Sequence, residues 1–184
     1  MLTESWSENY ALISNGAKAS LPEINDGKLD TLGVTFPPKR EFEITLPEER
    51  QINRILIYSG NVLSYGLYCW DSKTSSWLTV GGLGTRVGQQ KVYSDKYKFA
   101  VPRFDHRLNF KTNKIKIVVI KAAKDGMTTT RTPGKYDKIV NQRTEYIQIG
   151  RDRVRVDLYD VFTYNEATIR EIEIYSYAPK AKTK

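Results

Sequence analysis

The stretch that decides the fold is Ile52–Val80, which reads INRILIYSGNVLSYGLYCWDSKTSSWLTV. Its first run, 52–58, is rich in β-branched and aromatic residues and ends at the turn-forming tripeptide 59–61. In the second run, 65–70, large apolar residues alternate with the others at the period of a half-buried strand. We expect the two runs to form a hairpin at the centre of a β-scaffold.

The inward face of the second run is predicted to carry Tyr65, Leu67 and Cys69, because residues two apart share a face of a strand. Turn-forming composition at 71–76 separates this run from a third one that begins at Trp77. We expect Trp77 to pack in the same core. Cys69 is the one cysteine of the chain, so it makes no internal disulfide and should behave as a small hydrophobe.

The outward face of the second run carries Tyr68 and Trp70. An exposed pair of this kind would be an unusual apolar patch. We expect a hairpin at 144–158 to fold over it. The alternative is that the pair is open and serves as a docking surface for a partner.

Strand-like patterns recur along the rest of the chain. They lie at 40–46, 91–101, 114–120, 145–149, 153–158 and 169–175. Turns or loops are predicted at 47–49, 81–90 and 121–141. No segment of ten or more residues has a helical pattern. The sequence therefore predicts an all-β protein, an antiparallel β-sandwich or jelly roll.

Composition excludes several classes of protein. A chain of 184 residues can bury a core without disulfides or metal clips. No apolar run approaches the ~18–20 residues that a membrane span needs, and the N-terminal MLTESWSENY lacks the pattern of a signal peptide. With one histidine, one cysteine and none of the common catalytic motifs, an enzyme is disfavoured. Hydrolysis by carboxylates alone stays open.

The net charge of +8 comes from the second part of the chain. Residues 1–100 hold 11 Lys/Arg and 11 Asp/Glu, whereas residues 101–184 hold 18 and 10. A basic surface can face phosphate, acidic polysaccharide or anionic lipid. The plainer interpretation is a solvated lysine-rich face together with the basic tail 178–184. Nucleic acid is disfavoured because no motif for it is present.

The segment Leu21–Gly33 concentrates turn residues and oxygen donors. Its acidic side chains, Asn25, Thr31 and the backbone carbonyls are the hard ligands that Ca²⁺ prefers, although the spacing is not that of an EF-hand. The alternative is an ordinary Asn-Asp-Gly turn.

Five sequence features occur in an order that is found elsewhere. They are Asn-Tyr-Ala…Asn-Gly-Ala-x-Ala-Ser near the N-terminus, Asn-Asp-Gly-x-x-x-Thr at 25–31, Phe-x-Ile-x-Leu at 42–46, Ile-Asn-Arg-Ile-x-Ile-Tyr at 52–58 followed by Tyr-x-Leu-x-x-Trp-Asp at 65–71, and Ile-Arg-Glu-Ile-Glu-Ile-Tyr at 169–175. This order resembles the discoidin, or coagulation-factor type C, domains. Those domains share the galactose-binding-like jelly roll with many bacterial carbohydrate-binding modules. The match covers roughly residues 8–120 and 167–177.

The resemblance implies an eight-stranded sandwich with neighbouring termini, which binds ligands and is not a catalyst. Many of the carbohydrate-binding relatives hold one structural Ca²⁺. The matching positions here are Asp26, Thr31 and an exposed Glu171 on the last strand, with carbonyls near Asn25 and Lys28. Lys28 departs from the family, which is often acidic at this position, and this puts the occupancy of the site in doubt.

The resemblance also bears on domain organisation. It predicts a single domain over 1–177, with the basic tail 178–184 behind it. The insertion at about 122–166 is longer than relatives usually carry, and we expect it to hold an accessory hairpin.

In the carbohydrate-binding relatives, loops at one end of the sandwich bind sugar through an aromatic ring and polar side chains. This mixture suits a ligand with a CH-rich face and a polar edge. The predicted ligand-binding residues are Phe104, His106, Arg107, Asn109, Arg86 and Asn61. Tyr65, on the inward face of its strand, is expected to pack in the core and not to bind the ligand. The alternative is that Phe104 belongs to the core and His106 is an ordinary loop residue.

The leading hypothesis is therefore a non-catalytic, calcium-stabilised carbohydrate-binding module, for which an acidic glycan is one option given the basic second part. A protein-interaction or assembly domain of the same fold, without sugar binding, is the alternative. We expect an extracellular, cell-surface or periplasmic location with the leader outside this chain, while a cytoplasmic one stays open.

Overall fold

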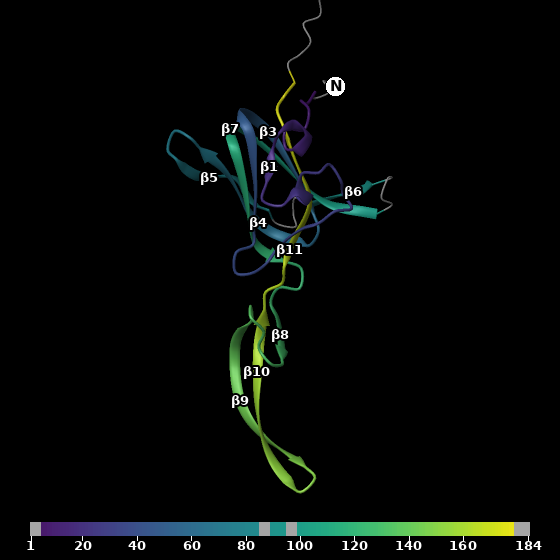
Figure 1. Ribbon diagram of the computed structural model, residues 1–184, viewed down its shortest axis with the longest axis vertical. Coiled ribbons are helices and arrows are strands. Elements are labelled where there is room, and N and C mark those ends of the chain that lie inside the picture. The colour runs from purple at the N-terminus through teal and green to yellow at the C-terminus, as the bar shows by residue number, and fades with distance from the viewer. Residues whose placement is uncertain (1–4, 85–88, 95–98, 179–184) are drawn as a thin grey trace, which may run out of the picture.

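The computed structural model describes residues 5–84, 89–94 and 99–178, and strands dominate them (Figure 1). The strands are β1 (Lys18–Ala19), β2 (Gly33–Thr35), β3 (Glu41–Ser59), β4 (Val62–Asp71), β5 (Ser76–Gly84), β6 (Gln89–Ser94), β7 (Phe99–Ala122), β8 (Met127–Thr130), β9 (Lys138–Ile149), β10 (Asp152–Thr163) and β11 (Ala167–Tyr175). Within these ranges the helical elements are two short 3-10 turns, η1 (Ile13–Asn15) and η2 (Pro22–Ile24). The all-β prediction is confirmed. None of the helices in the described ranges has the length and apolarity to cross a membrane.

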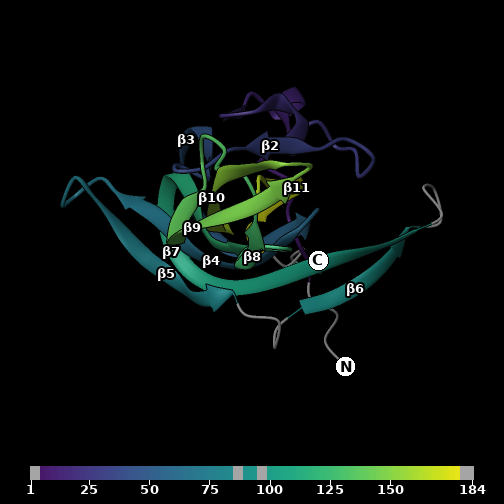
Figure 2. The ribbon, with the colours of Figure 1, turned by 90° about the horizontal axis from the view of Figure 1, so that it is seen from below.

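The main sheet has eight antiparallel strands, in the order β2-β11-β3-β7-β4-β5, with β1 paired to β3 and β6 to β7. β7 has 24 residues and would span about 80 Å if straight, more than a domain of this size. The long strands therefore bend, and the sheet curls round one core as a sandwich (Figure 2). The expected turn at 47–49 is wrong, because β3 runs through Pro47. A register shift against β7 at this point, between Thr45 and Arg50, accommodates the proline.

The core lies inside the curled sheet and confirms the predicted inward faces. Tyr65, Leu67 and Cys69 are fully buried, as are Ile55 and Ile57 of β3. Burial raises the pKa of the Cys69 thiol to about 12, so the residue stays a neutral, small apolar side chain.

The central hairpin is not the one expected. β3 and β4 follow each other through the turn at 59–61, but β7 lies between them in the sheet. β4 instead forms a hairpin with β5, in which Trp70 pairs with Trp77. A period-two pattern identifies a strand from local sequence, whereas its partner here is contributed by a segment far along the chain.

The prediction that Trp77 belongs to the core is wrong. Directly paired residues of an antiparallel hairpin share a face, so Trp77 joins Trp70 on the outer face of the sheet. Their rings meet edge to face at 5.4 Å, and the Lys116 Nζ atom lies 4.2 Å from the Trp77 ring centroid. Trp70 and Trp77 are each only partly exposed because they cover one another.

The insertion forms a second sheet, in the order β8-β10-β9, that projects from one end of the main domain as an arm (Figure 1). The predicted hairpin is confirmed, with Gly150 at φ 63° in its turn. The expectation that this hairpin covers Tyr68 and Trp70 is wrong, since the arm extends away from the main sheet. The expected loop at 121–141 also contains β8 and the start of β9.

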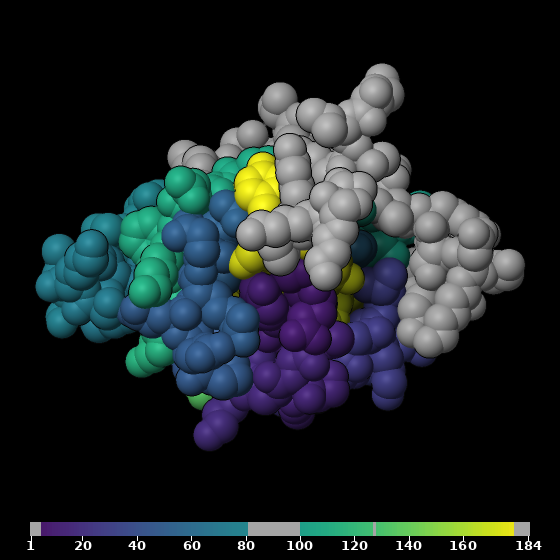
Figure 3. All heavy atoms as spheres, turned by 90° about the horizontal axis from the view of Figure 1, so that it is seen from above, coloured from purple at the N-terminus to yellow at the C-terminus, as the bar shows by residue number. Residues whose placement is uncertain are grey.

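The two ends of the described chain lie side by side at the opposite end of the domain from the arm (Figures 1 and 3). The Ser7 amide donates to the Ser176 carbonyl at 3.0 Å, and the Trp6 ring stacks on Tyr177 at 4.8 Å. The neighbouring termini implied by the resemblance are confirmed.

Candidate functional site

The predicted sugar-binding segment 103–109 is not a loop, because it lies within β7. Strand alternation sends its members to opposite faces of the sheet. Phe104 points inward, is 2% exposed and meets the Tyr65 ring edge to face at 5.0 Å. A ring buried to this extent offers no surface on which a sugar can stack, so the placement of Phe104 in an open binding site is wrong.

His106 shares the inner face with Phe104. Its Nε2 atom lies 2.5 Å from the Tyr65 hydroxyl, and burial lowers the pKa of the imidazole. A neutral imidazole bonded to a core tyrosine is part of the packing of the sandwich and does not belong to an open site.

Of the other predicted ligand-binding residues, Arg107 and Asn109 are neighbours on β7, whereas Asn61 lies elsewhere, in the turn between β3 and β4. Arg107 is on the outer face of β7, 4.6 Å from the Trp6 ring centroid, and the Asn109 Oδ1 atom accepts a hydrogen bond from Gln51 at 2.7 Å. Asn61 holds the strand that follows the arm, since its side chain accepts from the Thr168 amide at 2.7 Å. Arg86 lies outside the described residues.

The segment 21–33, which we call the oxygen-rich loop, brings the predicted metal residues together with Glu171. The Thr31 Oγ1 atom lies 3.2 Å from Asp26 Oδ1 and 3.3 Å from the carbonyl oxygens of Glu23 and Lys28. Glu171 reaches this loop from β11, where its Oε2 atom accepts a hydrogen bond from the Gly27 amide at 3.2 Å. The expectation that Glu171 is exposed is wrong, because it is 1% exposed.

A cation fits these residues. One threonine proton serves three surrounding oxygens, and the Glu171 Oε1 atom is buried without a hydrogen-bond partner in the described structure. Burial, together with the nearby Asp26 charge, raises the pKa of Glu171 to about 9. Two carboxylates with hydroxyl and carbonyl oxygens suit Ca²⁺. The described residues contain no group of three or more His, Cys, Asp or Glu side chains placed to hold a metal ion, so hydroxyl and carbonyl oxygens would have to complete the ligand set here.

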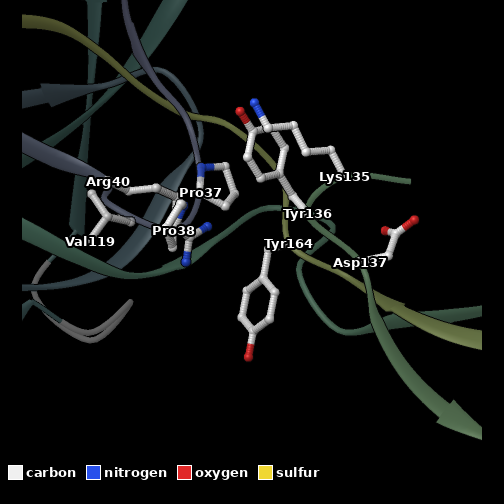
Figure 4. A pocket seen from close by; sticks show the side chains of 8 residues that line it. All are labelled: Pro37, Pro38, Arg40, Val119, Lys135, Tyr136, Asp137 and Tyr164. Carbon is white, nitrogen blue, oxygen red and sulfur yellow. The ribbon is translucent and has the colours of Figure 1, made fainter. Parts of the chain in front are cut away.

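A cavity of about 550 Å³ lies where the arm leaves the main domain (Figure 4). We call it the arm-base cavity, and it is lined by Pro37, Pro38, Arg40, Val119, Lys135, Tyr136, Asp137 and Tyr164. The domain side is contributed by the loop before β3 and by β7, and the arm side by the loop between β8 and β9 and the residue after β10. Segments far apart in sequence therefore build one site.

The aromatic groups of the arm-base cavity are accessible. Tyr136 is 40% exposed and Tyr164 is 41% exposed. The Lys135 Nζ atom lies 5.2 Å from the Tyr136 ring centroid, so a positive charge lies beside the ring. Arg40 is buried and already bonded to Asp125 at 2.7 Å, which leaves Lys135 as the exposed cation of the lining.

The sequence interpretation missed these residues. Tyr136 lies in Pro-Gly-Lys-Tyr-Asp, at 133–137, inside the predicted loop 121–141. The sequence does offer one signal for this residue: an aromatic side chain within a polar, turn-forming stretch can indicate an exposed binding residue. Its juxtaposition with Pro37 and Tyr164 depends on tertiary structure.

The sequence matches no protein-family model and no curated protein. Solved structures share the fold. The family 32 carbohydrate-binding module of Streptococcus pneumoniae EndoD has a TM-score of 0.52 and 11% identity, over 92% of this chain and 99% of that module. Truncated AlyQ, with CBM32 and alginate lyase domains, has a TM-score of 0.53 and 10% identity, over 98% of this chain and 36% of that one. SpGH29 has a TM-score of 0.51 and 10% identity, over 94% of this chain and 28% of that one.

This chain therefore spans nearly the whole of an isolated module but little more than a third, or less, of the two longer chains. At these identities the likeness concerns the fold. The chain has the galactose-binding-like, or discoidin, β-sandwich fold of the family 32 carbohydrate-binding modules.

Proposed function

We propose that this chain is a non-catalytic carbohydrate-binding module and that its glycan binds in the arm-base cavity. The observation that carries the proposal is the pair of accessible rings, Tyr136 and Tyr164, in an open cavity walled by Pro37 and Pro38. The fold supports it, since the module of Streptococcus pneumoniae EndoD that shares this fold is a carbohydrate-binding module.

The chemistry of the cavity suits a sugar. A tyrosine ring offers an apolar surface for the CH-rich face of a pyranose, and its hydroxyl can exchange hydrogen bonds with the polar edge. Lys135 adds a positive charge that a uronic acid carboxylate would complement. We therefore favour an acidic glycan, and a chain of the same fold that carries an alginate lyase domain is consistent with this choice.

We also propose that Ca²⁺ stabilises the module. Asp26, Thr31 and Glu171 would hold the ion, with the carbonyls of Glu23 and Lys28. A bound ion would neutralise the two carboxylates and fix the loop against β11. Its role is structural, because the oxygen-rich loop and the arm-base cavity share no residue.

Glycans of this kind are met outside the cytoplasm, so we propose that the chain acts at the cell surface, in the periplasm or outside the cell. The alternative is an assembly domain that keeps the fold without binding sugar.

Calorimetric titration with a panel of galactosides and uronates tests the function. We expect saturable heat with at least one sugar, and a stronger response to uronates than to neutral galactosides. No response across the panel, together with a stable oligomer, would overturn sugar binding in favour of assembly.

A further inference from the structure

The outer face of the main sheet carries an aromatic cluster that shares no residue with the arm-base cavity. Trp70 of β4 pairs with Trp77 of β5, and Tyr68 lies on the same side of the sheet because it precedes Trp70 by two residues. The two lysines of β7 that flank the buried Ile115 also point outward. We call this surface the tryptophan face, and it is formed by Tyr68, Trp70, Trp77, Lys114 and Lys116.

The rings of the tryptophan face lie low on the sheet and are accessible. Gly66 is on the same side of β4 as Tyr68, and a Cβ atom there would lie 2.8 Å from the Tyr68 ring. The Tyr68 ring therefore lies along the sheet, over Gly66, and does not stand out from it. Tyr68, Trp70 and Trp77 are each partly exposed, and the arm extends away from the main sheet (Figure 1). The result is a shallow aromatic platform and not a closed pocket.

Two ammonium groups lie against this platform. The Lys116 Nζ atom is 4.2 Å from the Trp77 ring centroid, and the Lys114 Nζ atom is 5.7 Å from that of Trp70. Among the described residues, neither lysine forms an ion pair with a carboxylate. A cation–π contact at a partly exposed ring is weaker than a hydrogen bond to a charged group. Both ammonium groups are thus available to a ligand that carries negative charge.

The other charges on this side of the sheet do not cancel the lysines. β3, the neighbour of β7, presents two acidic residues here. Glu41 is bonded to Lys39 at 3.4 Å, which leaves Glu43 as the remaining acid of β3 beside the lysines. Lys18 of β1 adds a third cation, since it pairs with Thr45 on the same side of the sheet. The platform and its surroundings are therefore positively charged.

We propose that the tryptophan face is a second glycan-binding site and that it takes a stretch of an acidic polysaccharide chain. The rings offer apolar surface to the CH-rich faces of the sugars, and the ammonium groups complement uronate carboxylates. A shallow, open surface suits a segment within a long chain, whereas a cavity suits a short sugar. The inference rests on the proposed function for the class of ligand, and it adds a separate site. A chain long enough to reach both sites would bind with higher avidity.

Other polyanions fit the tryptophan face less well. An amphipathic surface binds an anionic membrane by burying apolar side chains among the lipid headgroups. Rings that lie along a sheet do not insert in this way. Single-stranded nucleic acid is bound in a positively charged groove that follows its backbone. The platform is flat and offers no such groove.

Tryptophan fluorescence of the full chain reports on this face directly. The chain has three tryptophans, so a Trp6→Phe background leaves Trp70 and Trp77 as the emitting residues. Alginate, a polymeric uronate, should change this emission in a saturable way. Lys114→Gln combined with Lys116→Gln should weaken the binding of alginate that is measured by this signal at least about tenfold.

A matched control removes the same charge from another part of the surface. Arg151→Gln combined with Arg153→Gln takes two exposed cations from the tip of the arm and should leave the emission response unaltered. Circular dichroism establishes that each variant is folded. Lys116→Gln alone serves as a milder variant if the double lysine variant is not folded.

The proposal is overturned if alginate leaves the emission unchanged, or if the arginine control weakens the response as much as the lysine variant does. Calorimetry with the monosaccharide uronates of alginate separates this failure from failure of the proposed function. Heat from a monosaccharide, without an emission response to alginate, removes the second site alone, whereas absence of both removes the proposed function as well. A larger response to a single-stranded DNA oligonucleotide or to phosphatidylserine vesicles than to alginate would assign the face to that polyanion and overturn the glycan assignment.

Discussion

The guanidinium of Arg40 donates a 2.7 Å hydrogen bond to Asp125, and both side chains are 6% exposed. Arg40 precedes β3, whereas Asp125 belongs to the arm and also accepts from the amides of Ala122 and Asn165 at 2.8 Å. The pair thus links the main domain to both connections at the base of the arm, the one that enters the arm and the one that leaves it. Because Arg40 lines the arm-base cavity, the shape of that cavity depends on this ion pair.

Asp125→Ala should be strongly destabilising, because it leaves the Arg40 charge buried without its partner. We expect the free energy of unfolding to fall by about 3–5 kcal/mol, measured by urea denaturation. Lys39→Ala is the control, since it breaks the neighbouring exposed pair of Lys39 with Glu41 at 3.4 Å. That change should cost less than about 1 kcal/mol. Similar losses in the two variants would contradict a structural role for the buried pair.

Glu171 predicts a dependence of stability on pH in the absence of metal. Its pKa is about 9 in the folded chain against an ordinary 4.5. Between these values the folded state keeps a proton that the unfolded state has lost. The free energy of unfolding should therefore fall as pH rises through this window, by up to about 1.4 kcal/mol for each pH unit.

Ca²⁺ should abolish this slope, because a bound dication favours the ionised carboxylate. Melting curves recorded with EDTA and with Ca²⁺ across the window check the expectation. Glu171→Gln should lose both the slope and the response to Ca²⁺. Glu173→Gln, on the same strand, should keep the response to Ca²⁺ and most of the slope, because the Glu173 charge raises the Glu171 pKa less than burial does. If Ca²⁺ leaves the melting temperature of the wild-type chain unchanged, Asp26, Thr31 and Glu171 are not its ligands.

We expect Phe104 to contribute to the stability of the fold and not to sugar binding. Phe104→Ala removes a buried ring that packs on Tyr65, and we expect a loss of about 3–5 kcal/mol in the free energy of unfolding. Asn109→Ala, at an exposed position of the same strand, should cost less than about 1 kcal/mol. Denaturation curves of both variants measure these two losses in the free energy of unfolding. An unaltered stability in Phe104→Ala would show that the ring is not part of the core.

Strands and inward faces could be predicted from the sequence because both depend on a local period of two. Tyr65, Leu67 and Cys69 are buried as that period requires. Strand partners could not be predicted in this way, since β7 enters between β3 and β4 from far along the chain. The face of Trp77 could not be predicted either, because alternation does not carry across a turn and the pairing of Trp77 with Trp70 decides its face.

Glu171 illustrates a different limit. Alternation along 169–175 correctly predicts that Glu171 and Ile172 lie on opposite faces, since Glu171 pairs with Tyr58 and Ile172 with Ile57. It does not predict that the loop at Gly27 covers Glu171 and buries it. Its relation to Asp26 and Thr31 came from the family resemblance. The arm-base cavity had no such precedent, because its rings come from the insertion.

The most direct test of the account is a calorimetric titration of tyrosine variants with the sugar that binds the wild-type chain best. Tyr136→Ala and Tyr164→Ala should each weaken binding about tenfold or more, which is about 1.4 kcal/mol for each factor of ten. Tyr146→Ala removes an equally exposed ring from the distal part of the arm and should leave the affinity unchanged. Wild-type affinity in both cavity variants would contradict sugar binding at the base of the arm.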